Sequence, residues 1–255
     1  MAVSRQQFQA TLDTLLQPER FKDYCPNGLQ VEGRQEIRRL VTGVTACQAL
    51  LDVAIAHQAD AILVHHGYFW RSENPCLTGT KGRRIRTLMA ADINLFAYHL
   101  PLDCHPELGN NAGLGRALGI STFGPLNAAD PTLPVFRGEY PAPRSQADIA
   151  MALRHALDRE VLSEASHDGG RQITTVAWCT GGGQGYIDVA ADYGIDLFVT
   201  GEVSEQTIHS ARERDIGFIA AGHHATERFG ARQVGDWLAQ EFGLWHQFVD
   251  IANPA

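Results

Sequence analysis

The stretch that decides the fold is Ala61-Ile62-Leu63-Val64-His65-His66-Gly67, in which an apolar run ends directly in two histidines. A short apolar run with β-branched residues indicates a buried strand. A second stretch has the same form, Phe218-Ile219-Ala220-Ala221-Gly222-His223-His224-Ala225-Thr226-Glu227. Both place imidazole groups where a strand ends and a site can open, which predicts a metal centre.

Apolar runs alternate with segments of helical periodicity along the chain, which is typical of an α/β fold. Strands are expected over residues 39–45, 61–64 and 93–99. The first should lead into a helix with Thr45 and Gln48 as a capping box. This helix is expected to bury Leu50, Leu51, Ala54 and Ile55. Five prolines between residues 124 and 143 suit a connector better than a core element, and they predict the domain boundary.

The part of the chain after this connector repeats the part before it. A shift of 136 positions places residues 48–54 on residues 184–190, and Asp60 on Asp196. Both parts also begin with a helix that follows a serine, with Gln or Asp three residues after that serine. These helices are expected over residues 6–16 and 145–158.

The ligand-type residues match in the same comparison. The strand 61–64 falls on residues 197–200, and His66 therefore falls on Glu202. In both copies an acid follows a histidine by four positions, as His99 with Asp103 and His223 with Glu227. Units of the βαβ type resemble one another in any α/β protein, but superimposed ligand positions favour duplication. We interpret residues 1–125 as one α/β repeat and residues 126–255 as a second, with mixed sheets.

The residue types indicate which metals would bind. Histidine and carboxylate ligands without cysteine suit divalent Zn, Fe, Mn or Ni, and two neighbouring ions usually need a bridging carboxylate. His223 and Glu227 would share one face at the start of a helix expected over residues 225–242. His65 and His66 are adjacent, so on a regular strand they point to opposite faces, and only at the strand end can both serve one centre. The pair therefore fits two neighbouring ions better than one.

Five segments carry a family resemblance and cover nearly the whole chain in order. They are Asn27-Gly28-Leu29-Gln30-Val31-Glu32-Gly33, His65-His66-Gly67, His99-Leu100-Pro101-Leu102-Asp103, Thr200-Gly201-Glu202 with His209, and Gly222-His223-His224-Ala225-Thr226-Glu227. In this combination the chain resembles the GTP cyclohydrolase I type 2 homologue family, also called dinuclear metal-centre proteins and named for the NGG-interacting factor three. The resemblance implies two intertwined α/β repeats and a ring-shaped hexamer. It also implies two metal ions bound by His65, His66, Asp103, His223 and Glu227.

Composition excludes several classes of partner. The 255 residues carry a formal net charge of −8, and no basic run is longer than Arg83-Arg84, so no nucleic-acid polymer or anionic membrane is expected to bind. The first residues lack an apolar signal core, and no segment approaches the ~20 apolar residues of a membrane span. We therefore expect a cytoplasmic protein. Five widely spaced cysteines without a C-x-x-C pair indicate reduced thiols rather than disulfides or a thiolate zinc site.

The sequence is compatible with two functions. The leading hypothesis is a dinuclear metal-dependent hydrolase whose small substrate resembles a nucleotide. A cyclohydrolase would direct water to C8 of a guanine ring, and a phosphohydrolase would direct it to phosphorus. The alternative is a ring-shaped binding or regulatory protein in which metal serves assembly or metal handling, without catalysis.

Glu202 is the candidate for a catalytic base because it occupies the position that His66 holds in the first repeat. If the repeats face one another, its carboxylate should reach the same cavity and take a proton from water. His209 lies seven residues further on and could orient Glu202 or shuttle its proton. The alternative is that Glu202 caps a helix starting near Ser204.

Three other segments allow both a functional and a structural interpretation. The loop Thr180-Gly181-Gly182-Gly183-Gln184-Gly185 could present backbone N–H groups to a phosphate, or it could be a tight turn without a ligand. Asn27-Gly28 could likewise be a plain turn. The aromatic residues Tyr68, Phe69 and Trp70 could stack a base, although packing is the more common role.

Overall fold

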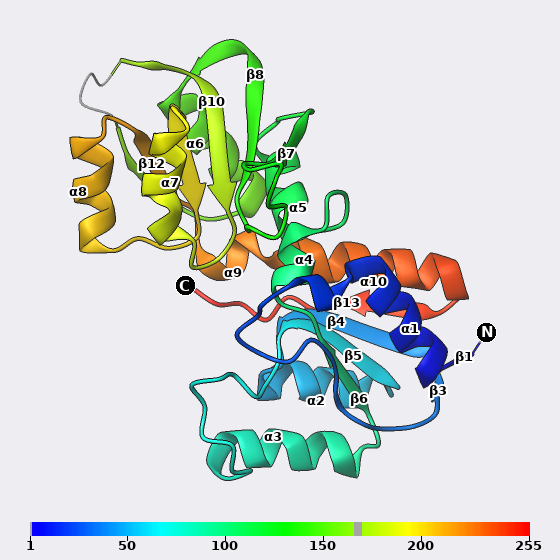
Figure 1. The fold of residues 1–255 in the computed structure, drawn as a ribbon. Helices are drawn as coiled ribbons and strands as arrows, with labels where there is room; N and C mark the ends of the chain where they lie inside the picture. The colour runs from blue at the N-terminus through cyan, green and yellow to red at the C-terminus, as the bar shows by residue number, and fades with distance from the viewer. Residues whose placement is uncertain (1, 166–169) are drawn as a thin grey trace. The chain divides into compact units, whose positions relative to one another are not determined.

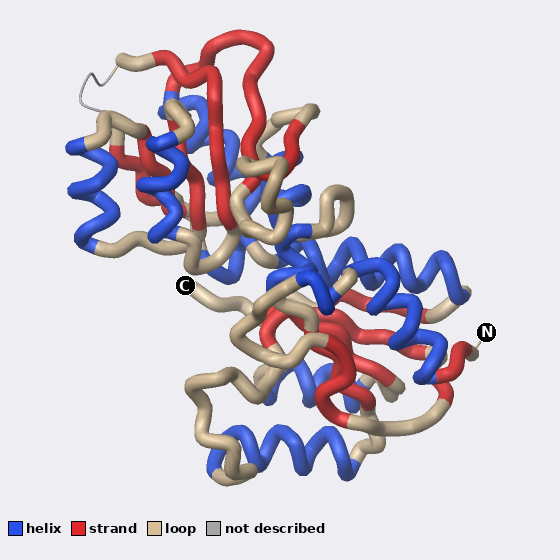
Figure 2. The backbone as a smooth tube through the Cα atoms, in the orientation of Figure 1, coloured by secondary structure: helices blue, strands red, loops and turns tan. Residues whose placement is uncertain are grey.

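The computed structural model describes residues 2–165 and 170–255, and the chain divides into two compact units. Unit 1 comprises Met1–Leu102 with Gly230–Ala252, and unit 2 comprises Asp103–Phe229 with Asn253–Ala255. Each unit is built on one large sheet with helices on its faces (Figure 1). Figure 2 shows how strands and helices alternate along the tube. The α/β class with mixed sheets is confirmed.

The sheet of unit 1 has the strand order β13-β4-β5-β6-β2. The first four strands run parallel, and β2 is an antiparallel edge. A separate two-stranded sheet joins β1 to β3. The strands of this unit are β1 (Val3–Ser4), β2 (Gly28–Val31), β3 (Glu36–Ile37), β4 (Arg39–Thr45), β5 (Ala61–His66), β6 (Asn94–Ala97) and β13 (Trp245–Phe248).

Helices cover both faces of this sheet, with α1 and α10 on one side and α2 and α3 on the other (Figure 1). Phe8 of α1 contacts both Phe96 of β6 and Phe242 of α10 through its ring. Because both faces are covered, the central strands read as continuous apolar runs. The helical segments of unit 1 are α1 (Arg5–Leu16), η1 (Pro18–Arg20), α2 (Gln48–Ala56), α3 (Gly79–Ala90) and most of α10 (Arg228–Phe242).

Unit 2 has a six-stranded sheet in the order β7-β8-β10-β11-β12-β9. Its strands β10, β11 and β12 are parallel, and β8 and β9 flank them in antiparallel pairs. Its strands are β7 (Phe123–Pro125), β8 (Phe136–Ser145), β9 (Leu162–Glu164), β10 (Gln172–Cys179), β11 (Leu197–Thr200) and β12 (Gly217–Ala220). Its helical segments are α5 (Asn110–Ala117), α6 (Gln146–Leu157), η2 (Gln184–Tyr186), α7 (Ile187–Asp192), α8 (Glu205–Glu213) and α9 (His223–Thr226). The five-residue helix α4 (Leu100–Cys104) contains the change from unit 1 to unit 2.

Two aspartates that the sequence comparison superimposes make the same contacts. Asp60 accepts hydrogen bonds from the backbone N–H groups of Arg38 and Arg39, at the start of the neighbouring strand. Asp196 accepts them from the N–H groups of Thr174 and Thr175, near the start of β10. An arginine completes each carboxylate cluster, Arg34 with Asp60 and Arg171 with Asp196, although the two arginines differ by one position from the 136-residue shift. Contacts of this detail are not general to βαβ units, so they support duplication.

The helices that open the repeats also end alike. Ser4 and Ser145 each accept a hydrogen bond from the backbone three residues later, which confirms the two predicted N-caps. Each helix has 12 residues, and each ends at a residue in the left-handed region, Gln17 with φ 48° and Asp158 with φ 51°. The strand at the end of each sequence repeat joins the sheet of the other unit, since β7 pairs in unit 2 and β13 pairs in unit 1.

Three expectations differ from the structure in detail. The helix after β4 begins at Gln48 with Cys47 as its N-cap and without a side-chain cap, so the predicted capping box is wrong. Leu50, Leu51 and Ala54 are buried as expected, but Ile55 is 40% exposed because it lies on the outer side of the helix. The predicted helix over residues 225–242 is two helices, α9 and α10, with Glu227 at the break.

The proline-rich segment does not separate compact units. Residues 124–143 lie inside unit 2, and the later part of this segment forms β8. Pro141 and Pro143 fall where the register of β8 against β10 shifts, a position where a missing N–H donor is tolerated. The division at residue 125 therefore stands as an interpretation of the sequence repeats, distinct from the compact units.

In the part of the chain that the structure describes, no helix combines the length and apolar character required to cross a membrane. Cys25, Cys47, Cys76, Cys104 and Cys179 are all free.

The paired aspartate clusters give a stability prediction. Asp60→Asn and Asp196→Asn should each lower the free energy of unfolding by ~1–3 kcal/mol, because the new amide N–H₂ faces N–H donors and the charge-assisted bonds are lost. The control is Asp192→Asn, whose side chain is 68% exposed in an ion pair with Arg214, and this change should stay within about 0.5 kcal/mol. Urea unfolding at pH 7 measures all three variants. Losses no larger than that of the control would show that the aspartate clusters do not hold the repeats.

Candidate metal centre

The histidine pair of unit 1 lies at the end of β5, as the sequence predicts. His65 is fully buried and His66 is partly exposed, and their ring centroids are 4.5 Å apart. The next residue is Gly67, and only glycine fits there, because a Cβ would lie 2.2 Å from Gln30 Oε1 and 2.6 Å from Ala97 Cβ. The strand therefore ends against a close backbone approach, with both imidazoles on its terminal residues.

His99 joins this pair within unit 1. It follows β6, the parallel neighbour of β5, and its ring centroid lies 4.9 Å from that of His65 and 5.8 Å from that of His66. One ligand atom from each of the three histidines falls within 4.8 Å of the others. His99 lies in one of the family motifs but was not among the predicted ligands. Its position at the carboxyl end of an adjacent parallel strand was the available signal.

In unit 2, His223 stands between two carboxylates. Its Nε2 lies 3.2 Å from Glu227 Oε2, and its Nδ1 lies 2.7 Å from Glu202 Oε1. The pKa of His223 is raised to about 9. The hydrogen bond to Glu227 is the largest cause, and the charge of Glu227 and the hydrogen bond to Glu202 act in the same direction. Burial of the imidazole opposes this rise. The break between α9 and α10 places Glu227 beside the imidazole, so the two residues meet as predicted without a continuous helix.

Asp103 is the second buried carboxylate of unit 2. It is 5% exposed, and Glu227 is 3% exposed. Asp103 Oδ1 accepts hydrogen bonds from Asn110 Nδ2 at 2.9 Å and from Thr180 Oγ1 at 3.1 Å. A carboxylate oxygen of Asp103 and one of Glu227 lie within 4.8 Å of one another. This unit therefore supplies oxygen donors, with His223 as its imidazole.

The glycine loop after β10 supports this carboxylate cluster. Gly181 has a φ of +65°, and a Cβ at this position would lie 2.0 Å from Glu227 Oε1. Only glycine allows the backbone to pass so close to the carboxylate. The backbone N–H groups of the loop are largely bonded within the unit, from Thr180 to Asn111 Oδ1, from Gly181 to Thr226 Oγ1 and from Gly183 to Thr200 Oγ1. These contacts favour the tight-turn interpretation over a phosphate cradle.

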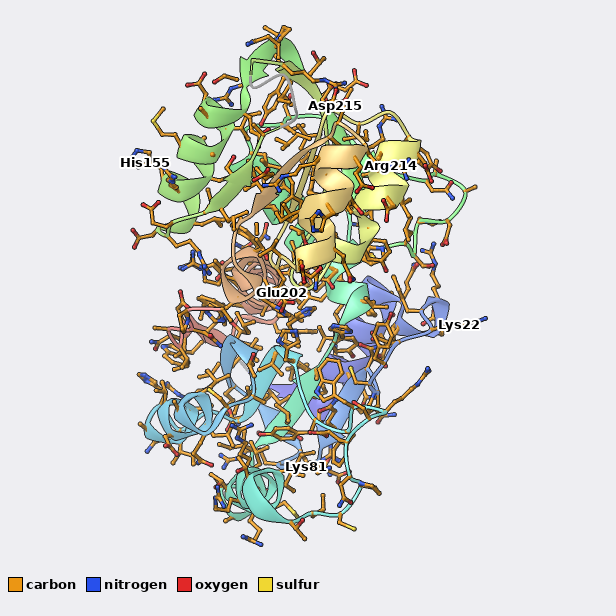
Figure 3. The ribbon with its side chains drawn as sticks, turned by 90° about the vertical axis from the view of Figure 1, so that its left-hand side faces the viewer. Lys22, Lys81, His155, Glu202, Arg214 and Asp215 are labelled. Carbon is orange, nitrogen blue, oxygen red and sulfur yellow. The ribbon has the colours of Figure 1, made fainter. Side chains whose placement is uncertain are left out.

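Glu202 lies in the segment between β11 and α8 (Figure 3). Its carboxylate accepts from His223 Nδ1 and, at 3.2 Å, from Gln184 Nε2. The cap of α8 is Ser204, which exchanges hydrogen bonds with Thr207, so Glu202 does not cap this helix with its side chain. His209 is exposed on α8, and among the described residues no hydrogen bond joins it to Glu202.

The model of the Duf34/NIF3 (NGG1p interacting factor 3) family matches residues 3–254 of this chain. The chain belongs to the Duf34/NIF3 family. A relative from Pseudomonas aeruginosa, named GTP cyclohydrolase 1 type 2 homolog, is 54% identical over 255 residues, 100% of both chains. A relative of the same name from Haemophilus influenzae is 53% identical over 249 residues, 98% of both chains. The resemblance stated from the sequence motifs is thereby confirmed.

Solved structures of Duf34/NIF3-like proteins show the same fold. One, described as protein ybgI of unknown function, is 49% identical with a TM-score of 0.93, covering 99% of this chain and 100% of its own. A protein from Thermus thermophilus is 34% identical with a TM-score of 0.90, covering 99% of this chain and 100% of its own.

The donor sets of this Duf34/NIF3 chain fit divalent metal ions. Unit 1 gathers imidazole nitrogens, and unit 2 gathers two buried carboxylates and an imidazole. Two carboxylates that are close and buried repel one another when ionised, and a cation removes this cost. Nitrogen and oxygen donors without thiolate suit Zn, Fe, Mn or Ni. The residues present are therefore chemically suited to the metals that the family resemblance implies.

Proposed function

We propose that this protein is a dinuclear metal-dependent hydrolase that acts on a small, nucleotide-like molecule. The observation that carries the proposal is the buried pair of carboxylates Asp103 and Glu227, whose oxygens lie within 4.8 Å. Such a pair is costly in a protein interior unless a proton or a cation compensates it. When bound, divalent ions supply Lewis acidity and activate water for attack on carbon or phosphorus.

The proposed ligands are His65, His66, Asp103, His223 and Glu227. His65 Nδ1 donates to the carbonyl oxygen of Tyr98 at 3.2 Å, so Nε2 carries the lone pair that can bind a metal. His223 Nδ1 faces Glu202 in the same way, an arrangement that orients a metal-binding imidazole. We propose two divalent ions per chain because the ligand set combines imidazoles with a carboxylate that can serve two ions.

Glu202 is the proposed general base. Its side chain is 44% exposed, so it can take a proton from the attacking water and release it to solvent. The bond from His223 Nδ1 to Oε1 holds the carboxylate in place. His209, exposed on α8, is retained as a candidate for passing the proton onward, although the solvent exposure of Glu202 makes a relay unnecessary.

The proposed substrate class is supported by the names of the relatives. The relatives carry the name GTP cyclohydrolase 1 type 2 homolog, which supports a substrate that contains a nucleotide or a part of one. The test is to purify the protein with its native metal and screen nucleotides and phosphoesters, with Glu227→Ala as the ligand-deficient comparison. We expect metal-dependent turnover of at least one compound by the wild type alone. Metal binding without any turnover would favour the ring-shaped metal-handling protein instead.

The role of Glu202 has its own prediction. Glu202→Gln keeps an acceptor oxygen for His223 but cannot take a proton, so turnover should fall by ~100-fold or more while metal content is unchanged. Glu205→Gln is the matched control, since Glu205 is exposed at the start of α8, three residues away. Metal content and turnover of all three proteins decide the role. Unchanged turnover would exclude Glu202 as the base, and loss of metal would make it an orienting residue for His223.

The assembly state is part of the proposal, and it rests on the family resemblance. We propose a homohexameric ring. Sedimentation velocity at micromolar concentration should give a single species near six chains. A monomer under these conditions would contradict the ring and would also weaken the metal-handling alternative, which relies on it.

A further inference from the structure

Asp23 of unit 1 has both carboxylate oxygens occupied by protein donors. Its Oδ1 accepts from Tyr24 N at 2.6 Å and from His99 Nδ1 at 2.7 Å. Its Oδ2 accepts from Asn27 Nδ2 at 3.0 Å and from Leu100 N at 2.9 Å. The side chain is 3% exposed. Burial would raise the pKa of Asp23, but the bond and charge of His99 and the bonds from Asn27 and Leu100 lower it to about 2. Asp23 is therefore a fixed anion whose contacts hold His99.

Asn27 fixes the backbone of the same histidine. Its Oδ1 accepts from His99 N at 2.7 Å, while its Nδ2 donates to Asp23. The next residue, Gly28, has a φ of +107°, and its backbone enters β2 opposite Ala97. From the sequence, Asn27-Gly28 could have been a plain turn. In the structure, the Asn27 side-chain amide hydrogen-bonds both the Asp23 carboxylate and the His99 backbone N–H.

The hydrogen bonds determine which nitrogen of His65 and of His99 is available. A carbonyl and a carboxylate can only accept, so Nδ1 of His65, which faces Tyr98 O, and Nδ1 of His99, which faces Asp23, must both carry hydrogen. His66 Nδ1 faces Thr45 Oγ1 at 3.2 Å, and because a hydroxyl can donate or accept, this contact leaves the tautomer of His66 open. In each neutral ring with this tautomer, Nε2 carries the lone pair. His65 and His99 are both held by Nδ1, which makes Nε2 their donor atom.

The aromatic neighbours restrict the His99 ring further. Trp70 makes an edge-on contact with it, with centroids 5.0 Å apart and an interplanar angle of 84°. Trp70 follows Phe69, whose φ of +66° is unusual for an aromatic residue. Glu73 Oε2 holds this turn by accepting from the N–H groups of Phe69 and Trp70. These two hydrogen bonds fix the turn that places Trp70 against the His99 ring.

A different ligand group in the same region has its carboxylate occupied by protein donors. Asp23, Cys25 and His99 also offer ligand atoms within 4.8 Å of one another. Burial, together with the charge of Asp23, raises the pKa of the Cys25 thiol to about 12, so the thiol keeps its proton at neutral pH. Both oxygens of Asp23 already accept from protein donors. His99 therefore belongs functionally with the histidine pair.

We infer that His99 is an additional metal ligand beside His65 and His66, and that Asp23 orients its ring. This inference rests on the metal-binding part of the proposed function and adds one ligand and its orienting carboxylate. Carboxylate–histidine–metal arrangements of this kind fix the tautomer and raise the basicity of the ligand. The chemical class is a divalent ion that accepts neutral nitrogen, such as Zn²⁺ or Co²⁺.

The first test is calorimetric titration of the metal-stripped full chain with Zn²⁺. Asp23→Asn should weaken binding by ~10–100-fold, and His99→Ala should weaken it at least as much. The control is His155→Ala, because His155 is exposed and points away from α6 (Figure 3), and this variant should bind like the wild type. His99→Gln, measured beside circular dichroism, replaces His99→Ala if the latter fails to fold. Unchanged zinc affinity in a folded His99 variant would overturn the inference.

The second test uses the wild type and needs no variant. Long-range ¹H–¹⁵N spectra should show His99 protonated at Nδ1 before and after zinc is added, with a large shift of Nε2 on addition. An unmoved Nε2 signal would overturn the inference, even if His99→Ala weakens binding, because the loss would then reflect packing. Neither experiment depends on turnover. A protein that binds zinc through His99 but hydrolyses nothing would refute the proposed hydrolase and leave this inference intact.

Discussion

Parallel pairing of neighbouring strands brings their carboxyl ends to one edge of a sheet, and the candidate ligands depend on this constraint. In unit 1, β5 and β6 are parallel neighbours, and they end at the histidine pair and just before His99. In unit 2, β11 and β12 have the same relation, and they end before Glu202 and His223. Ligand-type side chains gather in each unit because the sheet delivers them to one edge.

Duplication explains why two such edges exist. The superimposed aspartates Asp60 and Asp196 accept hydrogen bonds from backbone N–H groups near the start of the preceding strand in each repeat. The two sheets are therefore stabilised by the same kind of contact. The chemistry at the edges has diverged on this common scaffold. Unit 1 presents imidazoles, whereas unit 2 presents mainly carboxylates, and His66 and Glu202 occupy matching positions with different donor atoms. Imidazole nitrogens on one unit and carboxylate oxygens on the other are both donors that suit borderline divalent ions.

The sequence was sufficient for features that depend on local pattern. Strands with continuous apolar runs and serine-capped helices are visible within short windows, and β4 was predicted over the same residues that form it. The missing capping box after β4 shows the limit, because the motif was present but Cys47 became the N-cap. Likewise the break at Glu227 interrupts a periodic pattern that reads as one helix.

The residues of the site likewise divide into those with a local sequence signal and those without one. His65, His66, His223 and Glu227 were recognisable because each lies in a local motif, and the structure brings each pair together within its own unit. Asp23 and Asn27 could not be assigned from sequence, because their bonds to His99 span 76 and 72 positions. Contacts at such separations depend on strand order rather than on spacing.

Metal stoichiometry is the measurement that tests the central claim most directly. Elemental analysis of the fully loaded wild type should find about two divalent ions per chain. His66→Ala should lose roughly one of them, and Glu227→Ala should weaken the binding of both, because its carboxylate is proposed to serve both ions. One ion or none in the loaded wild type, or a Glu227→Ala variant that retains two tightly bound ions, would contradict the dinuclear account.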